Sequence, residues 1–164
     1  MQSFENLQTA MFEIYQTLVN NIEIRKLLFH DVENALELSA PKFSAIKEHI
    51  ILSPIFDSTK PPYNKNTMIT LALTRSVYDS DDVILNSIIK INVLTKSDLW
   101  VLKSNKLRLF EIIKNINNLI HDKKFATSHK LSFKQMELSI LDEDLSGYSL
   151  SFLLEEGSGM VESF

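Results

Sequence analysis

The sequence predicts an α+β fold in which an antiparallel sheet of about four strands, arranged as two hairpins, packs against amphipathic helices. Three observations predict it. Apolar residues recur every three or four positions near the amino terminus and again over residues 107–120, a spacing typical of helices that bury one face. Two other regions alternate apolar and polar residues, as strands do. We expect one domain over residues 1–156, followed by a flexible tail over residues 157–164.

The first third of the chain is predicted to be helical. One apolar stripe comprises Phe4, Leu7, Met11, Ile14, Tyr15, Leu18 and Val19. The pair Asn20-Asn21 is predicted to interrupt this helix, because asparagine side chains compete for backbone hydrogen bonds. Beyond it the pattern is less regular. It is compatible with a short helix over residues 27–38 and another over residues 44–52, separated by Pro41.

The next segment is a predicted irregular connection followed by a long hairpin. Residues 53–66 hold three of the four prolines, which marks a loop. From Thr67 to Thr95, two alternating runs rich in β-branched residues flank the polar stretch Asp79-Ser80-Asp81-Asp82, and this order predicts an antiparallel hairpin. The apolar faces are predicted to hold Ile69, Leu71, Leu73 and Val77 on one strand and Val83, Leu85, Ile89, Ile91 and Val93 on the other.

A principal helix and a closing hairpin complete the predicted domain. The helical pattern follows Ser97-Asp98 and carries Leu102, Leu109, Ile113, Ile116 and Ile120. A start at Asn105 is equally compatible, because Lys103-Ser104-Asn105 can be a break, and the long helix is expected to include Leu107 to Ile120. From Leu131 to Leu154 the alternation returns, with a change of parity that predicts a β-bulge near Lys134 or Gln135. A polar turn over residues 142–147 separates the two strands.

Composition and charge exclude several classes of function. A formal charge of −4 gives no basic surface for binding a phosphate backbone, so we expect no sequence-specific nucleic-acid binding. The absence of cysteine excludes disulfides and thiolate zinc sites. No glycine-rich phosphate motif occurs. We expect neither a membrane-spanning helix nor a signal peptide, because no run of about 18 apolar residues occurs and the amino terminus has no basic leader followed by an apolar stretch.

The candidates for chemistry each have a simpler structural interpretation. The four histidines lack the spacing of a helical zinc pair, and no serine lies in a nucleophile motif, so we expect no enzyme, metal or cofactor. Asp79, Asp81 and Asp82 are interpreted as a solvated turn, because the segment lacks the glycine and glutamate of a calcium loop. Trp100 is open to two interpretations, core packing or an interface contact.

The hairpin from Thr67 to Thr95 is the first candidate for a contact between subunits. Its arms would reach roughly 40 Å, longer than a core of this size needs to cover, so part of it is expected to project. A projecting hairpin has unpaired edges and an exposed apolar face that a neighbour can cover. We therefore hypothesise that Ile89 and Ile91, with Asp79, Asp81 and Asp82 at the tip, contribute to a contact between subunits.

The order of elements from Phe4 to Leu154 resembles that of tail-completion, or tail-terminator, proteins of long-tailed phages. The matching features are the amino-terminal helix, a loop with Pro61-Pro62-Tyr63, the long hairpin, one long helix and the closing hairpin. The resemblance implies a hexameric ring in the virion neck, assembled in the host cytoplasm. Such a ring would cap the tail tube, join it to the head connector, and let DNA pass without reading it. It implies no catalytic residues.

Two other hypotheses come from different classes of protein. A cytoplasmic adaptor would bind one partner through an exposed apolar face or sheet edge, and it would be a monomer or a dimer. A small hydrolase would require a pocket with converging titratable groups. The size of the particle in solution distinguishes a ring protein from an adaptor.

Overall fold

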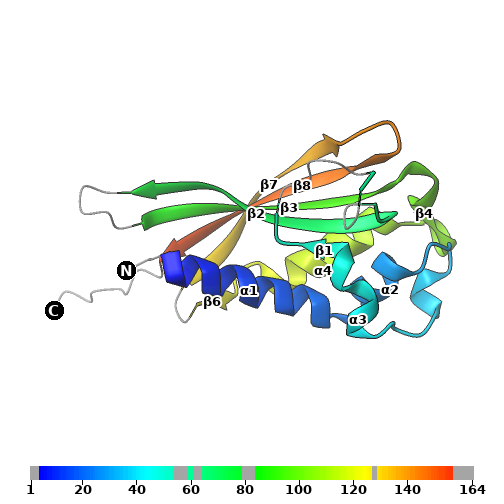
Figure 1. Ribbon diagram of the computed structural model, residues 1–164, viewed down its shortest axis with the longest axis horizontal. Helices are drawn as coiled ribbons and strands as arrows, with labels where there is room; N and C mark the ends of the chain where they lie inside the picture. Colours follow the sequence, from blue (N-terminus) through cyan, green and yellow to red (C-terminus); the bar gives the residue numbers. More distant parts are fainter. Residues whose placement is uncertain (1–3, 54–58, 61–63, 79–83, 127–128, 157–164) are drawn as a thin grey trace.

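The computed structural model describes residues 4–53, 59–60, 64–78, 84–126 and 129–156 (Figure 1). Its helices are α1 (Phe4–Asn20), α2 (Ile22–Phe29), α3 (Phe43–Ile46) and α4 (Arg108–Ile120). Its strands are β1 (Ile50–Ile51), β2 (Thr67–Tyr78), β3 (Ile84–Lys96), β4 (Val101–Leu102), β5 (Lys106–Leu107), β6 (Lys124–Phe125), β7 (His129–Ile140) and β8 (Leu145–Glu156). Short 3₁₀ turns cover Ala35–Glu37, Lys47–His49, Ser97–Leu99 and Lys103–Asn105.

The main sheet is mixed and has the strand order β1-β2-β3-β8-β7-β6. The four long strands in its middle are antiparallel, and they are the two predicted hairpins placed side by side. The α+β class is therefore confirmed. The strand number is corrected, because short strands extend both ends and β1 pairs parallel to β2. The 44–52 helix is also wrong in part, since Ile50–Ile51 is a strand.

Each predicted helix boundary that had a local signal is close to the observed one. Helix α1 ends at Asn20, and Asn21 caps α2 by accepting a hydrogen bond of 2.9 Å from the Ile24 amide. Helix α4 begins at Arg108, because Ser104 and Asn105 have positive φ angles that no helix continues through. The start just after Ser97-Asp98 is therefore wrong, and the break that the sequence offered as its alternative is confirmed. The helix predicted over residues 27–38 is shorter, since α2 ends at Phe29.

The helices lie on one side of the sheet, and the core is the layer between them (Figure 1). The sheet contributes rows of apolar residues that run across all four long strands. One such row joins Leu71, Ile91, Leu150 and Met136. Helix α4 adds Leu109, Ile112, Ile116 and Ile120, and α1 adds Leu7, Ala10, Ile14, Leu18 and Val19.

Three register shifts bend the sheet. The register of β2 against β3 shifts between Leu73 and Arg75 and again between Val77 and Tyr78, and that of β7 against β8 shifts between Phe133 and Gln135. The shift in β7 is the one that the parity change predicted. Bulges strengthen local twist, and Figure 1 shows the two hairpins leaving the centre of the sheet in different directions.

Arg108 joins α4 to the end of α2 and is completely buried. Its guanidinium donates to the carbonyls of Leu27 at 2.6 Å, His30 at 2.9 Å and Val32 at 2.9 Å, and its Nε donates to Leu99 at 2.9 Å. Burial lowers the pKa of Arg108, and the charge of Asp31 opposes that shift. The positive group thus satisfies carbonyls that a helix end leaves without partners.

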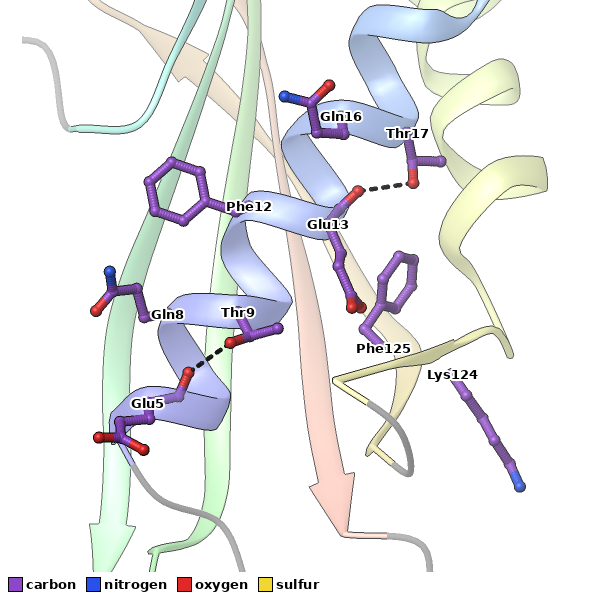
Figure 2. Close-up of a pocket in the computed structure, with 9 residues that line it drawn as sticks. All are labelled: Glu5, Gln8, Thr9, Phe12, Glu13, Gln16, Thr17, Lys124 and Phe125. Atoms are coloured by element: carbon purple, nitrogen blue, oxygen red, sulfur yellow. Dashed lines mark hydrogen bonds between the residues drawn. The ribbon is translucent and has the colours of Figure 1, made fainter.

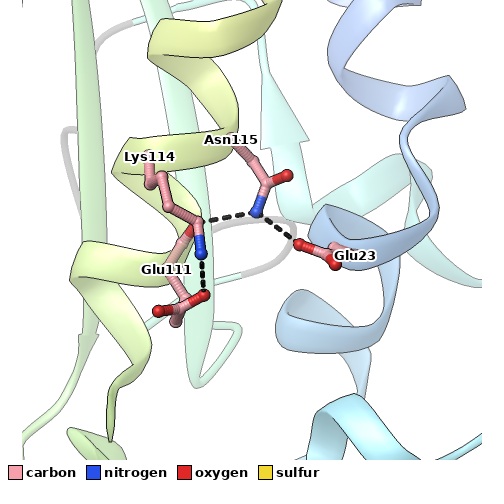
Figure 3. Close-up of polar contacts among 4 residues, drawn as sticks. All are labelled: Glu23, Glu111, Lys114 and Asn115. Atoms are coloured by element: carbon pink, nitrogen blue, oxygen red, sulfur yellow. Dashed lines mark hydrogen bonds and ion pairs between the residues drawn. The ribbon is translucent and has the colours of Figure 1, made fainter.

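A polar contact connects the same two helices nearer the surface (Figure 3). The Asn115 amide donates to the Glu23 carboxylate of α2 at 2.9 Å and to the Glu111 carbonyl of its own helix at 2.8 Å. Lys114 forms an ion pair with Glu111. Glu23 and Lys114 are exposed, whereas Glu111 and Asn115 are partly buried. Contacts with exposed charges add little stability compared with the buried Arg108.

Candidate assembly surface

Strand β7 is an edge strand along most of its length. Strand β8 pairs with it from His129 to Ile140, whereas β6 pairs only with His129 and Lys130. The Phe133 amide donates to His121 Nδ1 at 3.1 Å, which extends the covered part by a few residues. Among the described residues, 134–140 have no strand on their outer side. Unpaired edge groups of this kind readily pair with another chain.

The same strand carries an exposed apolar stripe on the face that the helices cover elsewhere. Its cross-strand partners on that face are Phe152, Leu150 and Tyr148, of which the first two are completely buried. Exposure along β7 rises steadily toward the hairpin tip. The values are 37% for Phe133, 43% for Met136, 62% for Leu138 and 70% for Ile140. We call these four residues the β7 stripe.

The stripe is exposed because the helices stop short of it. Helix α4 packs on β3, and its Phe110 stacks on Tyr148 of β8 with ring centroids 5.4 Å apart. Phe110 is itself 42% exposed, so it marks the border of the covered region. Figure 1 shows the β7–β8 hairpin rising away from the helices toward its tip. Adjacent exposed apolar side chains of this kind are typical of interaction sites.

The opposite end of the sheet has a second open edge. Strand β1 pairs with β2 only at Ile69 and Thr70, and no described residue pairs with the outer side of residues 73–78. Leu73 on this edge is 39% exposed and lies on the helix face. It belongs to the same row as Phe133, through Ile89 and Phe152. Both ends of one row therefore expose an apolar side chain.

The other face of the sheet is mostly polar and has charges at both edges. Asn92 donates to Thr70 at 2.9 Å, and Lys90 lies 3.9 Å from Glu137, across the small side chains of β8. Glu137 is exposed on β7, and Arg75 is exposed on β2 beyond the bulge. The two edges thus have charges of opposite sign on the same face.

Two of the contact residues that the sequence predicts on the long hairpin lie in the core. Ile89 and Ile91 have no exposed surface, because they face the helices in the core. The expectation that they lie on an exposed face is wrong, and their part in a contact between subunits stays a prediction that this burial does not support. Asp79, Asp81 and Asp82 lie outside the described residues.

Trp100 packs against the core, as one of its two interpretations predicted. It is partly buried, and its ring lies 6.2 Å from that of Tyr148. Its Nε1 is buried without a hydrogen-bond partner. An interface contact by Trp100 stays a prediction. The β7 stripe was not predicted as a contact surface, although the sequence carries its signal in the alternation of Met136, Leu138 and Ile140 with polar residues.

The groove along α1 does not offer a comparable arrangement (Figure 2). It is open and runs along the outer side of the helix beside β6, and it is lined by Glu5, Gln8, Thr9, Phe12, Glu13, Gln16, Thr17, Lys124 and Phe125. The Glu13 carboxylate accepts a hydrogen bond of 2.7 Å from the Ala126 amide, which connects α1 to the segment after β6. Thr9 and Thr17 each donate to a carbonyl within the helix.

The described residues contain no group of three or more histidine, aspartate or glutamate side chains arranged to hold a metal ion. Within the same part of the chain, no helix has the length and apolar character needed to cross a membrane.

Comparisons with known proteins place the chain in a family. No curated protein matches its sequence. Among solved structures, a chain from the structure described as "Virion of native gene transfer agent (GTA) particle" has a TM-score of 0.53 and 10% sequence identity. That match covers 94% of this chain and 98% of the other, and it shows a shared fold. The family model of YomW matches residues 21–154, most of the sequence, and the chain therefore belongs to the YomW family.

Proposed function

We propose that the chain is a structural virion protein that assembles with copies of itself and with other virion proteins. The observation that carries this proposal is the β7 stripe on an open edge strand, which combines unpaired backbone groups with exposed apolar side chains. The likeness in fold to a chain of a gene transfer agent virion, over nearly the whole of both chains, supports a virion role.

The more specific proposal is a tail-terminator ring. The order of elements resembles that of tail-completion proteins, and the observed pair of long hairpins on one sheet retains that order. In this role a hexamer caps the tail tube in the virion neck, binds the tail tube protein and the head–tail connector, and lets DNA pass unread. The net charge of −4 is compatible with an opening that does not hold phosphates. The proposal includes no catalytic role.

The size of the assembly tests the proposal. Full burial of a leucine or isoleucine is worth about 1.5–3 kcal/mol. Covering the exposed parts of Leu138 and Ile140 is therefore worth about 3 kcal/mol, or about 100-fold in association. Light scattering of the wild-type chain should show hexamers or larger assemblies, and the double variant Leu138→Thr, Ile140→Thr should shift them to monomers.

A matched control separates this contact from a general loss of apolar surface. Val32 is 45% exposed but lies in the loop after α2, so Val32→Thr should leave the assembly unchanged. Circular dichroism should show that all variants retain the fold. A wild-type chain that stays a monomer or dimer at all concentrations would instead favour the adaptor hypothesis.

The virion role has its own test. Particles that encode this chain should contain it, and mass spectrometry of purified particles should detect it in a fixed ratio to the tail tube protein. Removal of the gene should leave heads and tails that do not join. Normal, infectious particles without the protein would contradict the terminator role.

A further inference from the structure

We propose that copies of the chain join head to tail, with the open edge of β7 of one copy pairing with the open edge of β2 of the next. This inference rests on the proposed assembly and names the two surfaces that meet. The partner is a second copy of this chain. The reasons are the strand directions, the side chains at the two edges, and the positions of the open segments along the strands.

The strand directions permit the pairing without turning a copy over. Neighbouring strands in the order β2-β3-β8-β7 are all antiparallel, so β2 and β7 run in opposite directions. When an identical copy stands beside the first in the same orientation, its β2 is antiparallel to the first copy's β7. The joined strands then continue one antiparallel sheet from copy to copy.

The side chains at the two edges match by face. Leu73 on β2 and the β7 stripe lie on the helix face, and all of them are more than one-third exposed. Arg75 and Glu137 lie on the polar face. Head-to-tail pairing therefore places apolar groups beside apolar groups on one face and opposite charges on the other.

Pairing of β7 with β7 of a second copy keeps the apolar contact but lacks the match of opposite charges. An antiparallel pair centred on residues 134–140 would place Glu137 directly opposite the same residue of the other copy. Like charges directly opposite each other destabilise a strand pair. Such a pair would also close a dimer and leave the β2 edge uncovered.

The positions of the open segments favour a closed ring. Relative to the row that contains Leu73 and Phe133, the open part of β2 lies toward the tip of the long hairpin, whereas the open part of β7 lies toward the β7–β8 turn. Pairing them requires each copy to shift along the strands relative to the previous one. A sheet that closes into a barrel requires a stagger of this kind.

Chemical cross-linking tests the arrangement, because the chain has no cysteine of its own. We would replace Ser139, on the polar face of β7, and Arg75, on the polar face of β2, by cysteine, alone and together. When the centres of the two open segments are aligned, these positions are close to each other. A flexible bis-maleimide accommodates a register that differs by a few residues.

The double variant Ser139→Cys, Arg75→Cys should form a ladder of covalent oligomers, and each single variant should remain uncross-linked. The cross-linker is added at a protein concentration at which light scattering shows each variant assembled. Variants that lack Arg75 should need a higher concentration than the wild type, because they lose the charge that matches Glu137. Covalent dimers of Ser139→Cys alone would show β7–β7 pairing and overturn the inference. Assembly without any ladder would overturn it while leaving the proposed function intact, whereas a monomeric wild-type chain would refute both.

Discussion

Replacement of Arg108 by methionine should destabilise the protein far more than a surface substitution does. The guanidinium makes four hydrogen bonds to backbone carbonyls, and methionine fills much of the same volume without any donor. The Leu27 carbonyl is buried, so the loss of its donor costs about 1–3 kcal/mol. The His30, Val32 and Leu99 carbonyls are partly accessible, and water replaces the donor there at about 0.5 kcal/mol each.

Relief of the buried charge offsets part of this cost. The net loss should therefore be about 3 kcal/mol of the free energy of unfolding, which lowers Tm by roughly 6–12 °C for a domain of this size. Arg108→Lys should be intermediate, because an ammonium retains the charge but lacks the planar fork that reaches carbonyls on two sides.

Chemical denaturation with urea, followed by circular dichroism, measures the difference. Arg25 of α2 provides a matched control, since it makes one hydrogen bond of 3.2 Å, to the Pro41 carbonyl, and Arg25→Met should cost less than about 1 kcal/mol. Equal stability of the Arg108→Met variant and the wild type would refute the reasoning that this cation holds the two helices together.

Two further predictions concern the sheet. A Cβ on Gly147 would lie 1.8 Å from the Val93 carbonyl oxygen, so Gly147→Ala should force β3 and β8 apart and cost about 1–3 kcal/mol, whereas Ser149→Ala on the same strand should be nearly neutral in thermal unfolding. His49 is nearly buried, and this burial lowers its pKa from 6.5 despite the hydrogen bond to the Thr67 carbonyl. The unfolded chain therefore binds the proton more readily, and stability is lost as pH falls below about 6.5. Melting curves of His49→Gln should depend less on pH over that range, and an equal dependence would contradict this account.

The parts of the fold that the sequence predicted are those with a local signal. The capping by Asn21 depends on residues three positions apart, and the bulge near Lys134 is visible as a change of parity within one strand. The break before Arg108 follows from the conformations of Ser104 and Asn105. Such features are determined by neighbouring residues, so one sequence is enough to predict them.

The parts that were missed depend on residues far apart in the chain. Ile50 and Ile51 form a strand only because β2, nearly twenty residues later, provides the parallel partner. The apolar pair by itself fits a helix equally well. Arg108 looks like an ordinary basic residue at a helix start, and its burial becomes apparent only when the end of α2 lies beside it. Tertiary contacts decide both cases.

Tertiary contacts also decide which apolar residues of the sheet are exposed for assembly. Ile91 and Met136 belong to one row on one face of the sheet and have similar apolar character, yet the first is completely buried and the second is 43% exposed. The alternation in the sequence is the same for both, so it determines the face of each residue and leaves its cover undetermined. The extent of α4 across the sheet decides which part of each row stays open. A hairpin that extends beyond its helices therefore carries apolar residues that no described part of the chain covers, and in this protein that hairpin is β7–β8.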